Sequence, residues 1–209
     1  AGQSWGGNVV VETVHRHPDR IGVVACVDGG FIELKTRMPD WDETASKLAP
    51  PRFESVKLTD IERWMASSAA DWPDEGRQGS LHNFERLDDG TVKPWLTFDR
   101  HIAVLRGLWE HNPSELFPSI DAPVLMIGAD SGQAAWESSK RDAIERAAAL
   151  LPRGRSVWLS PAHHDVHAQQ PDVVTNLLIE LAGAIALLCY PESDYISGEL
   201  LVCSGGLRI

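Results

Sequence analysis

The clearest candidate for chemistry is a serine that stands between glycines at the start of the chain. Residues 2–6 read GQSWG, which is the pattern G-x-S-x-G, and Gly7 follows at once. A serine hydroxyl is exposed as a nucleophile when the backbone turns tightly from a strand into a helix, and flanking glycines let neighbouring backbone pass. The helix expected next would direct its N-terminal dipole toward the same spot. The pattern predicts Ser4 as a nucleophile.

A second group of chemically active residues lies near the other end of the sequence. Residues 162–167 read AHHDVH and follow a short apolar run at 155–160. A histidine in a loop after a late strand can reach the serine and accept its proton as a general base. Three histidines so close together could also bind a metal, but no carboxylate or cysteine partners stand at a familiar ligand spacing. We therefore expect general-base chemistry, without a metal or another cofactor.

The elements that must position these residues alternate between strand and helix. A nearly all-apolar run rich in valine predicts a buried parallel strand at 21–27, and similar runs predict further strands at 123–128 and 155–160. Helical patterns occur at 9–17, 136–151 and 171–181. This alternation is typical of an α/β domain with a mostly parallel sheet.

The segment 36–118 departs from this alternation. It is polar and rich in tryptophan, with helical patterns at 59–70 and 98–110 and a turn signal at 88–90. We interpret it as a helical cap insertion between two parts of the core, residues 1–35 and 119–183. Its aromatic residues either form a small core of their own or line an apolar pocket; these are Trp64, Trp72, Trp95, Phe98 and Trp109.

Composition narrows the classes of partner. The formal charge of −11 argues against nucleic acid or an anionic membrane surface, because both require clustered basic side chains. The longest apolar run, 181–190, is shorter than the roughly 18 residues of a membrane-spanning helix. Three cysteines without a C-x-x-C pair predict neither a disulfide framework nor a zinc site. A small-molecule substrate and a cytoplasmic location are expected.

Four motifs together resemble the α/β-hydrolase superfamily over residues 1–182: GQSWGGN, GVVACVDGG, PVLMIGAD and HHDVHAQQP. The resemblance implies an α/β-hydrolase fold with a mostly parallel sheet and a helical cap, and a catalytic triad in the order serine, acid, histidine. In this family the catalytic histidine commonly precedes a proline by seven positions. Because Pro171 is present, the resemblance implies His164 as the base.

The resemblance leaves two choices for the acid. The family usually supplies it after the strand that follows the insertion, which implies Asp130, although Asp130 stands slightly early for the usual spacing. Some members place it at the end of the strand after the first helix, which implies Asp28. Asp28 is also explained as a turn residue before two glycines.

A serine at the nucleophile position implies an acyl-enzyme reaction. The expected substrates are esters, lactones or similar carbonyl compounds, and the backbone N–H of Trp5 is the expected oxyanion donor. Relatives that cleave haloalkanes or epoxides have an aspartate at this position instead.

The sequence also departs from the family. Its members carry four or five strands before the serine turn, and this chain starts at Ala1, directly before the motif. We therefore expect a truncated fold from a fragment or processed piece, with an exposed sheet edge that favours homo-oligomers. The alternative function is a catalytically silent fragment or interaction module.

Residues 184–209 resemble the C-terminal end of short-chain dehydrogenases, through YISGELLV and the following glycines. Neither a G-x-x-x-G-x-G loop nor a Y-x-x-x-K motif accompanies this tail. We therefore expect a further strand at 199–203 but no dehydrogenase activity.

Overall fold

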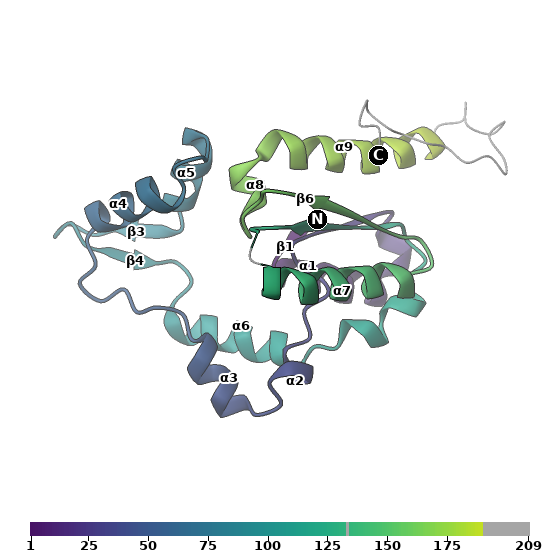
Figure 1. The fold of residues 1–209 in the computed structure, drawn as a ribbon, viewed down its shortest axis with the longest axis horizontal. Coiled ribbons are helices and arrows are strands. Elements are labelled where there is room, and N and C mark those ends of the chain that lie inside the picture. The colour runs from purple at the N-terminus through teal and green to yellow at the C-terminus, as the bar shows by residue number, and fades with distance from the viewer. Residues whose placement is uncertain (133, 190–209) are drawn as a thin grey trace.

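The computed structural model describes residues 1–132 and 134–189, and in them a parallel sheet is covered by helices on both faces (Figure 1). The described strands follow the order β1–β2–β5–β6, and every pairing between them is parallel. They are β1 (Gly2–Gln3), β2 (Val24–Val27), β5 (Val124–Ala129) and β6 (Gly154–Leu159). This arrangement confirms the predicted α/β class with a mostly parallel sheet.

The apolar side chains of the central strands alternate between two cores. One face packs against α1 (Trp5–Arg16) and α7 (Ala134–Leu150), and it receives Cys26 and Met126. The opposite face packs against α8 (Val166–Gln169) and α9 (Pro171–Cys189). Because both faces are buried, β2 and β5 consist almost entirely of apolar residues, as expected for central parallel strands.

The segment between β2 and β5 forms a separate group of elements, at the left and below the sheet in Figure 1. They are α2 (Leu34–Arg37), α3 (Trp41–Leu48), α4 (Leu58–Ser68), α5 (Asp74–Leu81), the antiparallel pair β3 (Phe84–Arg86) and β4 (Val92–Pro94), and α6 (Phe98–Glu110). Short 3₁₀ turns at 113–115 and 117–119 lead back to the sheet.

The aromatic residues of this segment divide between a local core and the surface. Trp72 belongs to a local cluster with residues of α4, and Trp109 is buried against Trp41. Trp64 and Trp95 are exposed. Of the two interpretations left open by the sequence, Trp72 supports a core of the segment's own.

Several expectations about element positions need correction. The strand before the serine turn was expected to be missing, but Gly2–Gln3 pairs with β2. The helix expected at 171–181 continues to Cys189, across the start of the expected tail at residue 184. The rest of that tail, with the expected strand at 199–203, lies outside the described residues.

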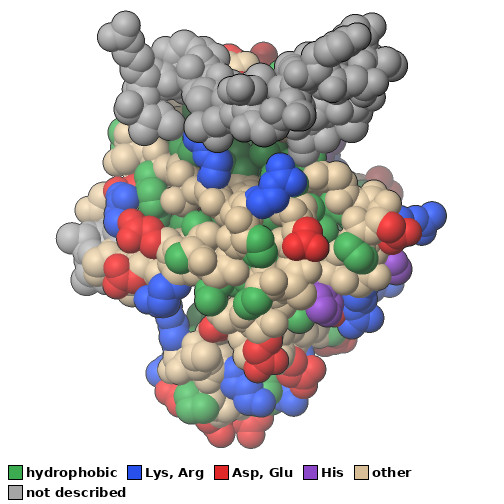
Figure 2. All heavy atoms as spheres, turned by 90° about the vertical axis from the view of Figure 1, so that its right-hand side faces the viewer, with side chains coloured by type: hydrophobic (Ala, Val, Ile, Leu, Met, Phe, Trp, Pro, Cys, Tyr) green, Lys and Arg blue, Asp and Glu red, His purple; other side chains and the backbone are tan. Residues whose placement is uncertain are grey.

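Charged side chains of both signs mix on the surface. Figure 2 shows basic and acidic groups interspersed on the face that it presents. Within the part of the chain that the structure describes, no helix combines the length and the apolar character needed to cross a membrane.

Candidate active site

Ser4 occupies a tight turn between β1 and α1. Its backbone angles are φ 51° and ψ −122°, a positive φ that is uncommon and strained for a residue other than glycine. The Ser4 N–H donates to Val27 O at 2.9 Å, and Ser4 O accepts from Gly7 N at 2.9 Å. The turn therefore links the end of the strand directly to the first turn of the helix, which is the geometry expected for an exposed nucleophile.

Close backbone contacts place this turn beside the loop that follows β2. A Cβ atom on Gly29 would lie 2.0 Å from Ser4 O, and one on Gly7 would lie 2.4 Å from Gly30 N. A Cβ atom on Gly6 would meet nothing within 4 Å. The close approach of the two backbones thus depends on Gly7 and Gly29. Gly6, a flanking glycine of the motif, was expected to prevent a backbone clash, but it does not have this role.

The same loop brings Asp28 to His164. The Nδ1 atom of His164 lies 2.6 Å from Oδ2 of Asp28. The Asp28 side chain is 2% exposed, whereas that of His164 is 53% exposed. A buried carboxylate therefore orients an imidazole whose other edge can meet a substrate, as an acid–base pair requires.

Asp28 is surrounded by donors. Its Oδ1 accepts the N–H of Ala129 at 3.0 Å, and the ammonium of Lys140 lies 3.2 Å and 3.3 Å from its two oxygens. Burial acts to raise the pKa of Asp28, but the hydrogen bonds from His164 and Ala129 and the charge of Lys140 outweigh it, so that the pKa is lowered. Asp28 is therefore a carboxylate near neutral pH.

Asp28 in turn changes the pKa of the His164 imidazole. The hydrogen bond to Asp28 raises the pKa of His164 above its ordinary value, burial and Lys140 oppose this rise, and the charges of Asp28 and Asp165 reinforce it. His164 is thus a stronger base than a free histidine.

Three glutamines fix the loop that carries His164. Gln3, directly before the nucleophile candidate, directs Nε2 at the backbone oxygen of His164 at 3.2 Å. Gln169 accepts the N–H of His163 at 2.7 Å and also donates to Asp71 at 2.6 Å. Gln170 donates to Pro161 O at 2.8 Å. The loop is therefore tied both to the serine turn and to the segment between β2 and β5.

Asp130, the first choice for the acid, makes other contacts. Its Oδ1 accepts the N–H of Gly132 at 2.9 Å, its Oδ2 lies 3.7 Å from Arg141, and its backbone oxygen accepts the N–H of Ala162 at 2.8 Å. The carboxylate thus supports its own turn, and the structure pairs His164 with Asp28 instead.

The structure does not bring every predicted residue into direct contact. Among the described residues, no hydrogen bond joins Ser4 Oγ to His164, although the Gln3 contact links their segments. Trp5 is the first residue of α1, where the N–H groups have no acceptor within the helix, as an oxyanion donor requires. Lys140 was missed because it belongs to no motif, and Gln3 was missed because it occupies a variable position of the G-x-S-x-G pattern.

A cavity of about 560 Å³ reaches the acid–base pair. That volume suits a small organic ligand. Asp28, Lys140 and His164 line it together with both apolar and polar side chains, among them Arg37 and Arg146, and Ser4 is not among its lining residues. Other contributors are Phe31, Ile32, Leu34, Leu48, Leu105, Leu108, Phe117, Ala143 and Ala147.

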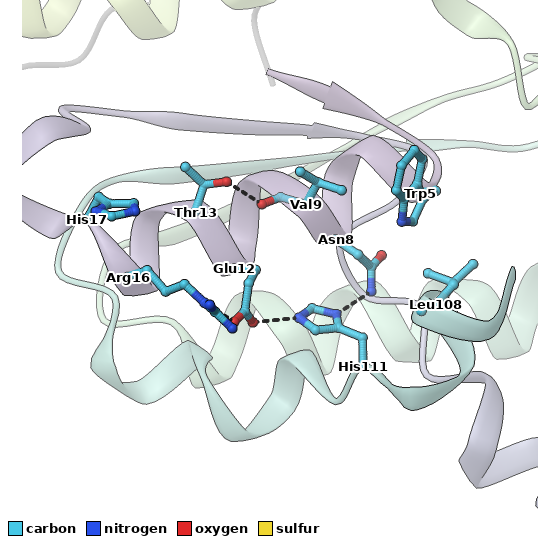
Figure 3. Close-up of a pocket in the computed structure, with 10 residues that line it drawn as sticks. Trp5, Asn8, Val9, Glu12, Thr13, Arg16, His17, Leu108 and His111 are labelled. Atoms are coloured by element: carbon cyan, nitrogen blue, oxygen red, sulfur yellow. Dashed lines mark hydrogen bonds and ion pairs between the residues drawn. The ribbon is translucent and has the colours of Figure 1, made fainter. Parts of the chain in front are cut away.

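A second, more open pocket of about 360 Å³ lies between α1 and the end of α6 (Figure 3). The His111 ring bridges Asn8, at 3.0 Å, and Glu12, at 3.1 Å. Asn8 also accepts the N–H of Gly30 at 3.0 Å. The hydroxyl of Thr13 donates to the backbone of its own helix. This network joins α6 to the loop after β2 and offers no activated nucleophile.

No group of three or more His, Cys, Asp or Glu side chains within the described ranges is arranged to hold a metal ion.

Comparison with known protein families shows to which family the chain belongs. The model of the alpha/beta hydrolase family matches residues 1–177. The chain belongs to the α/β-hydrolase family. The match ends before residue 184, so it gives no support to the short-chain dehydrogenase resemblance of the tail. A comparison with curated protein sequences finds no match.

Solved structures of other α/β hydrolases share the fold. An E-2-(acetamidomethylene)succinate hydrolase aligns with a TM-score of 0.65 at 19% identity, over 87% of this chain and 65% of that one. The thioesterase domain from the curacin biosynthetic pathway aligns with a TM-score of 0.58 at 15% identity, over 85% of this chain and 64% of that one. An esterase from M. tuberculosis aligns with a TM-score of 0.56 at 17% identity, over 88% of this chain and 61% of that one. This α/β hydrolase thus spans less than two thirds of the length of each of these structures.

Proposed function

We propose that the chain is a serine hydrolase that forms an acyl-enzyme with an ester, lactone or similar carbonyl substrate. Ser4 is the nucleophile, His164 the general base and Asp28 the acid, and the Trp5 N–H is an oxyanion donor. The observation that carries this proposal is the 2.6 Å contact between His164 and Asp28 beside the strained turn at Ser4. A hydrolase, a thioesterase domain and an esterase among the structural neighbours support the same reaction class.

The proposed reaction has two halves. Ser4 Oγ attacks the carbonyl carbon while His164 Nε2 accepts the hydroxyl proton, and the same proton then goes to the departing alkoxide or thiolate. In the second half His164 accepts a proton from water, the hydroxide attacks the acyl-enzyme, and the proton returns to Ser4. Throughout, buried Asp28 stabilises the imidazolium that forms beside it.

The substrate class follows from the lining of the larger cavity. Its leucine, phenylalanine and alanine side chains fit an apolar acyl or alcohol group, Arg37 and Arg146 add positive charge, and Asp28 and His164 lie in the same lining. The segment 36–118 contributes Thr36, Arg37, Leu48, Leu105 and Leu108 to this lining, and we propose that it acts as a cap over the substrate.

Hydrolysis of a series of p-nitrophenyl esters of increasing acyl length tests this proposal. Turnover by the purified chain, lost in both Ser4→Ala and His164→Ala, is the expected result. Turnover that survives either substitution in a folded variant contradicts the assigned roles.

One observation favours a second candidate, a silent interaction module. In the described part of the chain, the edge of β1 that faces away from β2 has no partner strand. Such an edge can pair with another copy of the chain. Light scattering together with the ester assay distinguishes the candidates: a dimer or larger species without esterase activity supports this alternative, and a monomer without esterase activity contradicts both.

A further inference from the structure

Lys140 is a buried cation in contact with the proposed acid. Its side chain is 10% exposed, and it reaches from α7 across to the end of β2. Lysine is rarely buried unless its charge is paired, because desolvation of the ammonium is costly. Here Nζ lies 3.2 Å and 3.3 Å from the two oxygens of Asp28 and also donates to the backbone oxygen of Ala129.

This contact does more than neutralise one buried charge. Oδ1 of Asp28 accepts from Ala129 N, Oδ2 is directed at His164 Nδ1, and the ammonium of Lys140 contacts both oxygens. Rotation of the carboxylate would break these contacts together. The ammonium therefore has two effects on the pair: it holds the carboxylate in position, and its charge opposes the attraction between the carboxylate and a protonated imidazole.

The geometry leads us to propose that Lys140 is a positioning residue of the triad, which fixes the Asp28 carboxylate toward His164 and restrains the basicity of that imidazole. The inference rests on the proposed function, in which His164 is the general base. Lys140 acts through Asp28 and is not assigned a contact with the reacting atoms.

Other charged groups near the imidazole must be separated from this effect. Asp28 faces His164 from β2, Asp165 follows it in the chain, and both raise its pKa, whereas Lys140 on α7 lowers it. Glu33, Arg37, Arg146 and His163 also line the cavity. Among the described residues outside the pair, Lys140 contacts the Asp28 carboxylate with a positive charge, so its substitution tests the proposed effect.

The test is an NMR titration of the His164 imidazole in the full chain. Lys140→Met removes both the charge and the hydrogen bonds, and Lys140→Gln retains a donor without the charge and serves if the methionine variant does not fold. Both should raise the pKa of His164, and Lys140→Arg should leave it close to the wild-type value. Lys47→Met is the matched control, because Lys47 is exposed and pairs only with Glu43 within the described structure.

The outcomes separate this inference from the proposed function. If the chain hydrolyses esters, the rate at acid pH relative to the alkaline plateau should fall several-fold in Lys140→Met or Lys140→Gln. An unchanged or lowered His164 pKa in these folded variants overturns the inference, even if hydrolysis depends on Ser4 and His164. A raised pKa in a chain that hydrolyses no ester supports the Lys140 contact and contradicts the proposed function.

Discussion

The Nδ1 atom of His164 lies 2.6 Å from Oδ2 of Asp28, although 136 positions separate the two residues in the chain. They meet because β2 and β6 both end at the carboxyl edge of the parallel sheet, so that Asp28 and the loop after β6 lie at the same edge. The ligands of α/β proteins commonly bind at this edge. The helix α7 adds Lys140 to the same carboxylate.

The first prediction separates the two candidates for the acid. Asp28→Asn should lower kcat by roughly 10³- to 10⁴-fold, because the amide neither stabilises the imidazolium nor selects the right tautomer. Asp130→Asn is the matched control and should change kcat by less than about tenfold, since Asp130 contacts its own turn and Arg141. A larger loss in Asp130→Asn than in Asp28→Asn would return the role to Asp130.

The second prediction concerns the pH dependence of activity. His164 must be neutral to accept the serine proton, and its hydrogen bond to Asp28 raises its pKa. The acid limb of kcat/KM should therefore have its midpoint above 6.5, the ordinary value for histidine. Stopped assays across the pH range measure this midpoint, and a midpoint at or below 6.5 contradicts the assignment of His164 as the base.

The third prediction concerns the pH dependence of stability. Because the pKa of His164 is raised in the folded state, its protonation stabilises the fold. This contribution is fully present below pH 6.5, the ordinary pKa of histidine, and is lost as the pH rises through the pKa of His164 in the folded state. The lowered pKa of Asp28 stabilises the fold above 3.8, and this contribution is lost as pH falls through its folded-state value. The difference in unfolding free energy between wild type and His164→Ala should thus be largest between these two pH values. Urea titrations measure it, and a difference that grows above neutral pH would contradict the sign.

The fourth prediction compares two neighbouring glycines of α1. Gly7→Ala would place a methyl group 2.4 Å from Gly30 N, so it should destabilise the fold by roughly 2–4 kcal/mol. Gly6→Ala meets nothing within 4 Å and should stay within about 0.5 kcal/mol of wild type. Urea unfolding of the two variants gives the comparison. Equal stabilities would show that α1 and the loop after β2 are not in close contact.

The fifth prediction concerns the loop that carries His164. Gln3→Leu removes the contacts to His164 O and Asp165 Oδ1, at 3.2 Å and 3.4 Å. Because Gln3 does not line the larger cavity, kcat should fall by about tenfold while KM changes little. Gln78→Leu, at an exposed position on α5, is the control and should match wild type. A change confined to KM would show that Gln3 affects substrate binding instead.

The parts of the fold with strong local signals were predicted from the sequence. The apolar runs predicted β2 and β5, whose residues are all buried, because central parallel strands are apolar on both faces. A strand was also predicted near the observed bounds of β6, but none of its residues is fully buried, so the expected burial was wrong there. The helix over 98–110 was predicted with the bounds that the structure gives. The helices α3 and α5 were not predicted, since they are only eight residues long and include few buried positions.

The candidate site was less predictable than the fold. The motifs identified Ser4 and the loop of His164, but they offered two acids, and the choice depends on which strand end faces the imidazole. Lys140 could not be predicted, because a lysine on a helix is usually exposed. Its burial follows from the contact between α7 and β5, which no local pattern reveals.

The most direct test of the central claim is labelling with a fluorophosphonate, followed by tryptic digestion and mass spectrometry. The peptide from Ala1 to Arg16 contains Ser4 as its only serine. Our account predicts that this peptide carries the label in wild type and in Asp130→Asn, and that labelling is lost in Ser4→Ala and His164→Ala. A folded wild-type chain that remains unlabelled, or a label on another peptide, would contradict the account.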